Sequence, residues 1–194
     1  YVGVKYCVAV NSGTAGLHAA VAAAGVGPGD EVITSPFTFL SSASSVLHHN
    51  GIPIFADIDS ETYNINPERI KEKITEKTKA IIPVDLYGQL ADIDEIMKIG
   101  ERHKVIVIED ACQAHGSASN RTNGAAFSFY PGKNLGAFGE AGAVTTNDGE
   151  HAQKIRMLRN HGQSSKYHHD LVGWNERMDG IQGAVLSVKL KYLK

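Results

Sequence analysis

Lys133 is the residue of this sequence best placed to act as a nucleophile. It lies in the stretch Phe127-Ser128-Phe129-Tyr130-Pro131-Gly132-Lys133-Asn134-Leu135-Gly136, just after a short apolar run. The proline and the two glycines around the lysine predict a tight loop whose backbone can approach a bound molecule. An amine that loses its solvation can become a nucleophile or form a Schiff base. Taken alone, the same pattern also fits a solvated loop lysine, so other residues must decide.

Two further stretches carry polar groups next to apolar segments. Asn11-Ser12-Gly13-Thr14 stands between the β-prone run 6–10 and the alanine-rich run 15–24, which predicts a strand, a turn and a helix start. Free N–H groups, a hydroxyl and the positive end of a helix dipole form an anion or phosphate site, although many helices begin with such caps and bind nothing. Asp110 follows the apolar run 105–108 and could be a magnesium ligand, a structural cap or the partner of a cationic ring nitrogen.

Standard nucleotide motifs do not explain these residues. The dinucleotide fingerprint would need glycine where Asn11 stands, and a P-loop would need glycine at Phe127 and a hydroxyl at Asn134. Without a P-loop, the magnesium interpretation of Asp110 loses most of its support. A phosphate site, a carboxylate for a ring nitrogen and a Schiff-base lysine are together what pyridoxal phosphate requires. Phe39 could stack on its ring, or could equally be a core phenylalanine.

Strand-like and helical segments alternate along the chain. This alternation predicts an α/β fold with a mainly parallel central sheet covered by helices on both faces. In such a sheet ligands bind at the carboxyl ends of the strands, where the turn after Val10, Asp110 and Lys133 should meet. The expected strands cover 6–10, 31–34, 52–56, 80–84, 105–108, 127–129 and 143–146, and the expected helices 15–24, a segment ending near 49, 67–74, 92–103, 149–159 and 179–193.

The composition is that of an ordinary globular protein. The 194 residues are 42% hydrophobic and 21% charged, which is enough for one large domain. The net charge of −2 gives no electrostatic case for nucleic acid or an anionic membrane, and no apolar run or leader pattern indicates a membrane span or secretion, so we expect a cytoplasmic protein. Cys7 and Cys112 lack metal-ligand spacing, and no metal site is predicted.

Four motifs together resemble the DegT/DnrJ/EryC1/StrS family of pyridoxal-phosphate sugar aminotransferases, in order and spacing along nearly the whole chain. The resemblance implies that residues 1–194 are the pyridoxal-phosphate-binding large domain of a fold type I aminotransferase, without the N-terminal arm and most of the C-terminal small domain. Compared with the family, the segment between Gly116 and Phe127 looks shortened, or some residues are absent from the sequence as given, and Ala141 stands where the family commonly has a glycine. The motifs are 11–17, 29–34, 109–116 and 127–136.

The resemblance also implies a role for each candidate site residue. Lys133 would carry the cofactor as a Schiff base and shuttle the proton, and Asp110 would keep the pyridine nitrogen protonated. Asn175 would reach the phosphate in the neighbouring subunit, which implies a homodimer with shared active sites. The remaining cofactor contacts would be Gly13, Thr14 and Ser128 at the phosphate, Phe39 on the ring and Gln113 beside it.

The implied reaction moves an amino group from L-glutamate to a keto carbon of a nucleotide-linked sugar, for cell-surface glycans such as lipopolysaccharide or for secondary metabolites. The stretches 130–136 and 167–186 resemble relatives that act at the 3-keto position more than those that act at C4. One alternative is a dehydratase relative, but these replace the lysine with histidine. Another is a non-catalytic dimerisation or sugar-nucleotide-binding fragment of the same fold.

Overall fold

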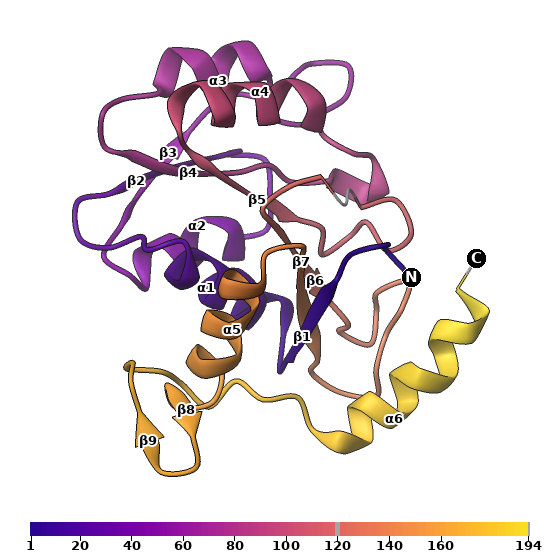
Figure 1. Ribbon diagram of the computed structural model, residues 1–194. Coiled ribbons are helices and arrows are strands. Elements are labelled where there is room, and N and C mark those ends of the chain that lie inside the picture. Colours follow the sequence, from indigo (N-terminus) through magenta and orange to yellow (C-terminus); the bar gives the residue numbers. More distant parts are fainter. Residues whose placement is uncertain (119–120, 194) are drawn as a thin grey trace.

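The computed structural model describes residues 1–118 and 121–193. Residues 119 and 120 belong to the segment between Gly116 and Phe127, which was expected to be shortened relative to the family. This expectation therefore lies partly outside the described residues. The chain forms one central sheet with helices on both sides, and Figure 1 shows the two helical layers. The expected α/β class with a mainly parallel sheet is confirmed.

The central sheet has seven strands in the order β1-β7-β6-β5-β4-β2-β3. Strand β7 runs antiparallel to both of its neighbours, β1 and β6, and the other neighbouring pairs are parallel. The carboxyl ends of β1, β6, β5 and β4 therefore point toward the same edge. The strands are β1 (Tyr6–Val10), β2 (Glu31–Thr34), β3 (Ile52–Phe55), β4 (Thr78–Ile82), β5 (Ile106–Asp110), β6 (Gly124–Ser128) and β7 (Gly142–Thr146).

Two separate apolar clusters cover the two faces of the sheet. One contains side chains from α1 (Gly13–Ala23), α2 (Ser41–Leu47) and α5 (Gly149–Leu158). The other contains side chains from α3 (Pro67–Lys73) and α4 (Ile93–His103). Helix α6 (Gly180–Lys189) and the 3₁₀ turn η2 (Leu190–Tyr192) close the chain.

Strand β5 is covered on both faces, which explains why the run 105–108 has no polar alternation. Val107 packs into the cluster under α3 and α4, whereas Ile108 packs into the cluster under α1. Because successive side chains point to opposite faces, the run 105–108, which is covered on both sides, is apolar at every position. The same alternation places Glu109 on the α4 side and Asp110 on the α1 side.

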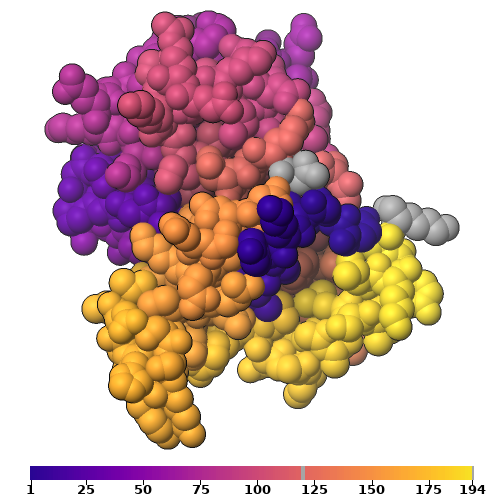
Figure 2. Space-filling view, in the orientation of Figure 1, coloured from indigo at the N-terminus to yellow at the C-terminus, as the bar shows by residue number. Residues whose placement is uncertain are grey.

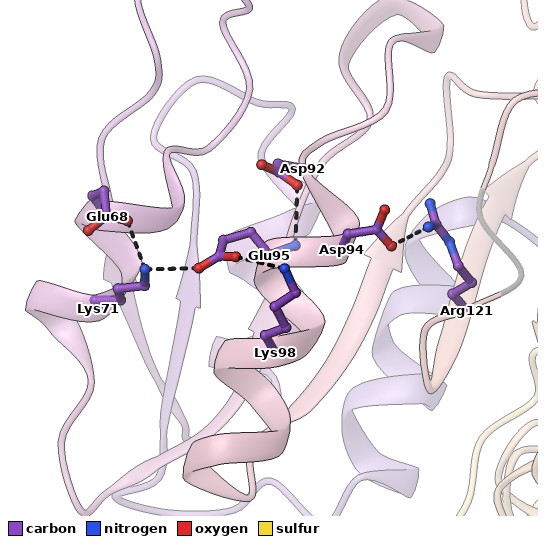
Figure 3. A network of polar contacts seen from close by, with 7 residues as sticks. All are labelled: Glu68, Lys71, Asp92, Asp94, Glu95, Lys98 and Arg121. Atoms are coloured by element: carbon purple, nitrogen blue, oxygen red, sulfur yellow. Dashed lines mark hydrogen bonds and ion pairs between the residues drawn. The ribbon is translucent and has the colours of Figure 1, made fainter.

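A polar network joins α3 to α4 on the outer surface (Figure 3). Lys71 Nζ contacts Glu68 at 2.7 Å and Glu95 at 3.0 Å, and Arg121 pairs with Asp94. Asp92 caps α4 by accepting from the N–H of Glu95 at 3.2 Å. These pairs are exposed to solvent and contribute little to stability, so the buried apolar faces hold the two helices in place.

Several expected boundaries shift. Asp110 is the last residue of β5 instead of the first residue beyond the strand, and the strand expected at 127–129 begins earlier, at Gly124, because it pairs with β5 in parallel from Ile108. The helix expected at 179–193 is divided into α6 and η2. A short hairpin of β8 (Gln163–Ser165) and β9 (His168–His169) was not predicted, and it projects from the body in Figure 2.

Candidate active site

A cavity of about 410 Å³ lies at the carboxyl edge of the sheet. It brings together all of the candidate residues except Asn175, from segments that are up to 120 residues apart, counted from Gly13 to Lys133. The parallel-sheet rule predicts this meeting, since β1, β5 and β6 all end here. The lining residues are Ser12, Gly13, Thr14, Leu17, Thr38, Phe39, Ser41, Val84, Asp110, Cys112, Gln113, Ser128, Tyr130, Lys133 and Glu140.

Helix α1 points its N-terminus into the cavity. Ser12 is the N-cap, and its Oγ accepts from the N–H of Ala15 at 3.0 Å. The N–H groups of Gly13 and Thr14 come first in the helix and have no partner within it, so they can bind an anion. Thr14 Oγ1 also lies 2.7 Å from Ser41 Oγ, which fixes its hydroxyl against α2.

Gly13 permits a close approach of α1 to two strand ends. A Cβ at this position would lie 2.7 Å from Cys112 Sγ and 2.7 Å from Ser128 Cβ. Such contacts are far inside van der Waals distance, so any larger residue would force α1 away from the sheet. Glycine is therefore required here by packing, independently of any ligand.

Asp110 is buried, with 6% of its surface exposed, and is held at both oxygens. Ser42 Oγ donates to Oδ2 at 2.7 Å, and the N–H of Cys112 donates to Oδ1 at 3.2 Å. Thr38 Oγ1 lies 2.8 Å from Ser42 Oγ. Because the one hydroxyl proton of Ser42 goes to Asp110, Thr38 must be the donor to Ser42. The carboxylate thus has a fixed orientation and still borders the cavity.

Lys133 stands half-buried on a tight turn. Its backbone N–H donates to the carbonyl of Tyr130 at 2.9 Å. The turn needs Gly136, where a Cβ would lie 2.4 Å from the carbonyl oxygen of Pro131. Among the residues that the structure describes, Lys133 Nζ has no hydrogen-bond or ion-pair partner, so the amine is available to react.

Gln113 is held by a hydrogen bond at the cavity, whereas Phe39 is exposed at the cavity rim. The Oε1 of Gln113 accepts from the N–H of Tyr87 at 2.8 Å, which leaves its amide NH₂ for other contacts. Tyr87 itself has a left-handed backbone, with φ 54°. Phe39 is 74% exposed at the cavity rim, so it is not a core phenylalanine in this chain.

Two titratable side chains next to the site stay uncharged. Burial, and then the charge of Asp110, raise the pKa of the Cys112 thiol well above its ordinary value. Burial, and then the nearby charge of Lys133, lower the pKa of His115, whose Nε2 lies 2.7 Å from the carbonyl oxygen of Ser128. Neither residue is an ionic partner for the lysine at neutral pH.

Asn175 lies apart from the cavity. It is exposed, on the segment that leads into α6, and its carbonyl oxygen accepts from Asn11 Nδ2 at 3.5 Å. Sequence reasoning also missed several residues that form the site, namely Thr38, Ser41, Ser42, Tyr130 and Glu140. The run of serines at 41–45 was an available signal, because a buried helix rarely carries so many hydroxyls without using them.

Within residues 1–118 and 121–193, no helix is long and apolar enough to cross a membrane. The same residues contain no group of three or more His, Cys, Asp or Glu side chains that could hold a metal ion.

Known proteins are similar to this chain along nearly all of its length. The sequence model of the DegT/DnrJ/EryC1/StrS aminotransferase family matches residues 1–194. A pleiotropic regulatory protein of Geobacillus stearothermophilus is 48% identical over 97% of this chain and 52% of its own length. A UDP-2-acetamido-2-deoxy-3-oxo-D-glucuronate aminotransferase of Pseudomonas aeruginosa is 46% identical over 98% of this chain and 55% of its own length.

A solved structure is also similar to this chain in fold and sequence. The crystal structure of ntda from Bacillus subtilis with bound cofactor pmp superimposes with a TM-score of 0.96 and 38% identity, over 100% of this chain and 46% of that one. The chain spans about half the length of the curated relatives it matches.

Proposed function

The chain belongs to the DegT/DnrJ/EryC1/StrS aminotransferase family, and we propose that it forms the cofactor-binding part of an enzyme that moves an amino group from L-glutamate to a keto carbon of a nucleotide-linked sugar. The observation that carries this proposal is the meeting of Lys133, Asp110 and the start of α1 around one cavity. Each of the three comes from a different strand end.

Pyridoxal phosphate fits the groups around this cavity. The free N–H groups of Gly13 and Thr14, with the hydroxyl of Ser128, would hold its phosphate. Asp110, fixed by Ser42, would hold the proton on its ring nitrogen.

When bound, pyridoxal phosphate supplies an electron sink for the substrate carbon that loses or gains the amino group. Lys133 Nζ would hold the cofactor covalently and, once displaced by the amino substrate, would move the proton at that carbon. Phe39 would cover the ring from the cavity rim, and Gln113 would approach it from the side with its amide NH₂.

The 3-keto position is the preferred site of amination in this proposal. The P. aeruginosa relative carries a 3-oxo sugar nucleotide in its name, and the stretches 130–136 and 167–186 support the same preference. A panel of 3-keto and 4-keto sugar nucleotides, each with glutamate as donor, tests it. Turnover of the 4-keto set alone would refute the preference while leaving the amino transfer intact.

A homodimer with shared active sites follows from Asn175. Its side chain is exposed and outside the cavity of its own chain, which fits a residue that serves the phosphate of a neighbouring subunit. Mixing two inactive variants, Lys133→Ala and Asn175→Ala, should restore part of the activity in hybrid dimers. The absence of any restoration, with hybrids demonstrated by mass spectrometry, would contradict shared sites.

The test of the central proposal is covalent cofactor binding. The purified protein should be yellow, and borohydride should fix the chromophore to the peptide that contains Lys133. The variant Lys133→Ala should lose the fixed chromophore, whereas Lys154→Ala, which removes a lysine far from the cavity on α5, should keep it. A colourless wild-type protein that ignores added cofactor would instead favour the non-catalytic binding fragment.

A further inference from the structure

A buried hydrogen bond joins α1 to the segment that leads into α6, outside the cofactor cavity. His18 Nδ1, on α1, lies 2.9 Å from Glu176 Oε1, and the two side chains are 9% and 14% exposed. Because a carboxylate oxygen only accepts, His18 Nδ1 carries the hydrogen of this bond. Within residues 1–118 and 121–193, the buried Oε2 of Glu176 has no hydrogen-bond partner. His18 is thus the one side chain in this part of the protein that satisfies the acid.

Aromatic rings fix the orientation of His18. The centroid of its ring lies 4.2 Å from that of Trp174 and 4.5 Å from that of His49, on which it stacks. The Nε2 of His49 donates to the backbone carbonyl oxygen of His18 at 3.1 Å. Burial, and then the nearby His18, lower the pKa of His49, so this second histidine is uncharged at neutral pH. Contacts with two rings restrict the rotation of His18, and its Nδ1 stays directed at Glu176.

The segment 174–176 is extended and is held along the end of α5. The N–H of Trp174 donates to the carbonyl of Leu158 at 2.7 Å, and the N–H of Glu176 donates to that of Arg159 at 2.9 Å. In an extended chain, successive side chains point in opposite directions. Trp174 and Glu176 face His18, whereas Asn175 between them is exposed. Anchoring its two neighbours therefore sets the direction of the Asn175 side chain.

We propose that His18 and Glu176 are a positioning pair, which holds the segment 174–176 on α1 and so directs Asn175 away from its own cavity, toward the phosphate bound by a second copy of this chain. The pair acts through Asn175, since neither of its members lines the cavity. The proposal rests on the proposed function for the destination of Asn175. The anchoring of the segment is a property of the single chain.

The position of His18 on α1 links the two phosphate sites of such a dimer. Gly13, at the start of the helix, offers its N–H to the phosphate of its own chain, and His18 comes five residues later, about 7 Å along the helix axis. One helix would thus hold its own phosphate at its N-terminus and, through Glu176, the residue that serves the neighbour's phosphate. A pair that only stabilised α1 would affect the site of its own chain instead.

The first test needs no cofactor. His18→Asn and His18→Leu introduce side chains of nearly equal size, and only asparagine keeps an N–H donor in the place of Nδ1. In His18→Leu, hydrogen exchange should be roughly tenfold faster at the amide of Glu176, the effect of one lost hydrogen bond to a charged group. The amide of Asn11, which donates to the carbonyl of Glu176 at 2.9 Å, should exchange faster too. In His18→Asn both amides should stay within about twofold of the wild type.

His48→Asn is the matched control. The His48 ring lies 5.1 Å from that of His18, but no hydrogen bond joins it to Glu176, so the Glu176 amide should not change. The amide of Asp110, which donates to Pro83 in the sheet at 2.8 Å, reports general destabilisation and should be unaffected in all three variants. No acceleration in His18→Leu, or the same acceleration in His18→Asn or at Asp110, would overturn the proposal.

The second test separates the two subunits of the proposed dimer. Borohydride fixes pyridoxal phosphate only on a chain that has Lys133, so a hybrid of wild-type and Lys133→Ala chains has one reporting site. His18→Leu in the Lys133→Ala chain should raise the cofactor concentration needed for fixation roughly fivefold, because that chain supplies Asn175. The same change in the chain that has Lys133 should stay within about twofold. His18→Asn in the Lys133→Ala chain should restore fixation.

The two placements of His18→Leu decide between positioning and stability. An equal or larger effect in the chain that has Lys133 would show that the pair only stabilises its own α1, and would overturn the proposal. If the wild type binds no cofactor, the proposed function and the destination of Asn175 fail together. The exchange results then still decide whether His18 and Glu176 anchor the segment.

Discussion

The hydrogen bond from Ser42 to Asp110 gives the sharpest quantitative prediction of the candidate site. The bond is 2.7 Å long, Ser42 is fully buried, and its partner is a carboxylate. Net contributions of hydrogen bonds to charged groups are about 1.5–3 kcal/mol. In Ser42→Ala, Thr38 cannot replace the lost donor, because its hydroxyl lies against Ser42 and not against Asp110.

The expected result is weaker cofactor binding. In this variant the Cys112 N–H still donates to Asp110 Oδ1, and water in the cavity can hydrate Oδ2 in place of the serine hydroxyl. We therefore expect a loss at the lower end of that range, about 1.5 kcal/mol. This corresponds to roughly tenfold weaker binding of pyridoxal phosphate, since about 1.4 kcal/mol is a factor of ten. Visible absorbance titration of the cofactor-free protein measures it.

Ser45→Ala is the matched control. Ser45 is equally buried on the same helix, but its hydroxyl donates to the carbonyl of Ser42 instead of to the site. It should bind the cofactor within about twofold of the wild type, as expected of a change that leaves the charged bond intact. The reasoning is refuted if both variants lose affinity equally, or if Ser42→Ala loses none while thermal unfolding shows that it is folded.

Three further predictions concern stability. Gly13→Ala should lower the free energy of unfolding by about 1–3 kcal/mol because its Cβ overlaps Cys112 and Ser128, whereas Gly27→Ala, where no atom lies within 4 Å, should be neutral in urea unfolding. Asp148→Ala should cost about 1 kcal/mol in the same assay, since it removes the cap of α5 that accepts from Glu150 N–H at 2.8 Å. Burial lowers the pKa of His151, so the unfolded chain binds a proton more readily and stability should fall as pH drops below about 6.5. In His151→Gln that decline should become shallower; an unchanged pH profile would exclude this histidine as its cause.

The strand ends of the site could be predicted from local sequence, because apolar runs fix the strands and the parallel sheet fixes where they end. The uninterrupted apolar run 105–108 marks a central strand, and the position of this strand predicts that Asp110 lies at its carboxyl end. The same reasoning predicted the turn at Gly13 and the loop of Lys133, although each was ambiguous until all three met.

Contacts between helices and strand ends were beyond the reach of such reasoning. Ser42 reaches Asp110 only because α2 packs across the sheet in a particular rotation, and residue spacing does not contain that rotation. The hairpin at 163–169 was missed for a different reason: its strands are three and two residues long and consist of Gln, Ser and His, so no apolar alternation marks them. Asn175 is a third case, since the proposed role depends on a second subunit.

The arrangement around Cys112 explains how one small cavity can keep opposite charges unpaired. The charges of Asp110 and Lys133 both act on the Cys112 thiol, one raising and the other lowering its pKa, so both lie near this side chain. A carboxylate at position 112 would pair with the lysine and occupy its amine, and a cation would neutralise Asp110. A buried thiol that stays protonated does neither. The carboxylate is instead satisfied by the Ser42 hydroxyl and a backbone N–H, which are neutral donors, and so the lysine amine and the carboxylate both remain free to act on a ligand.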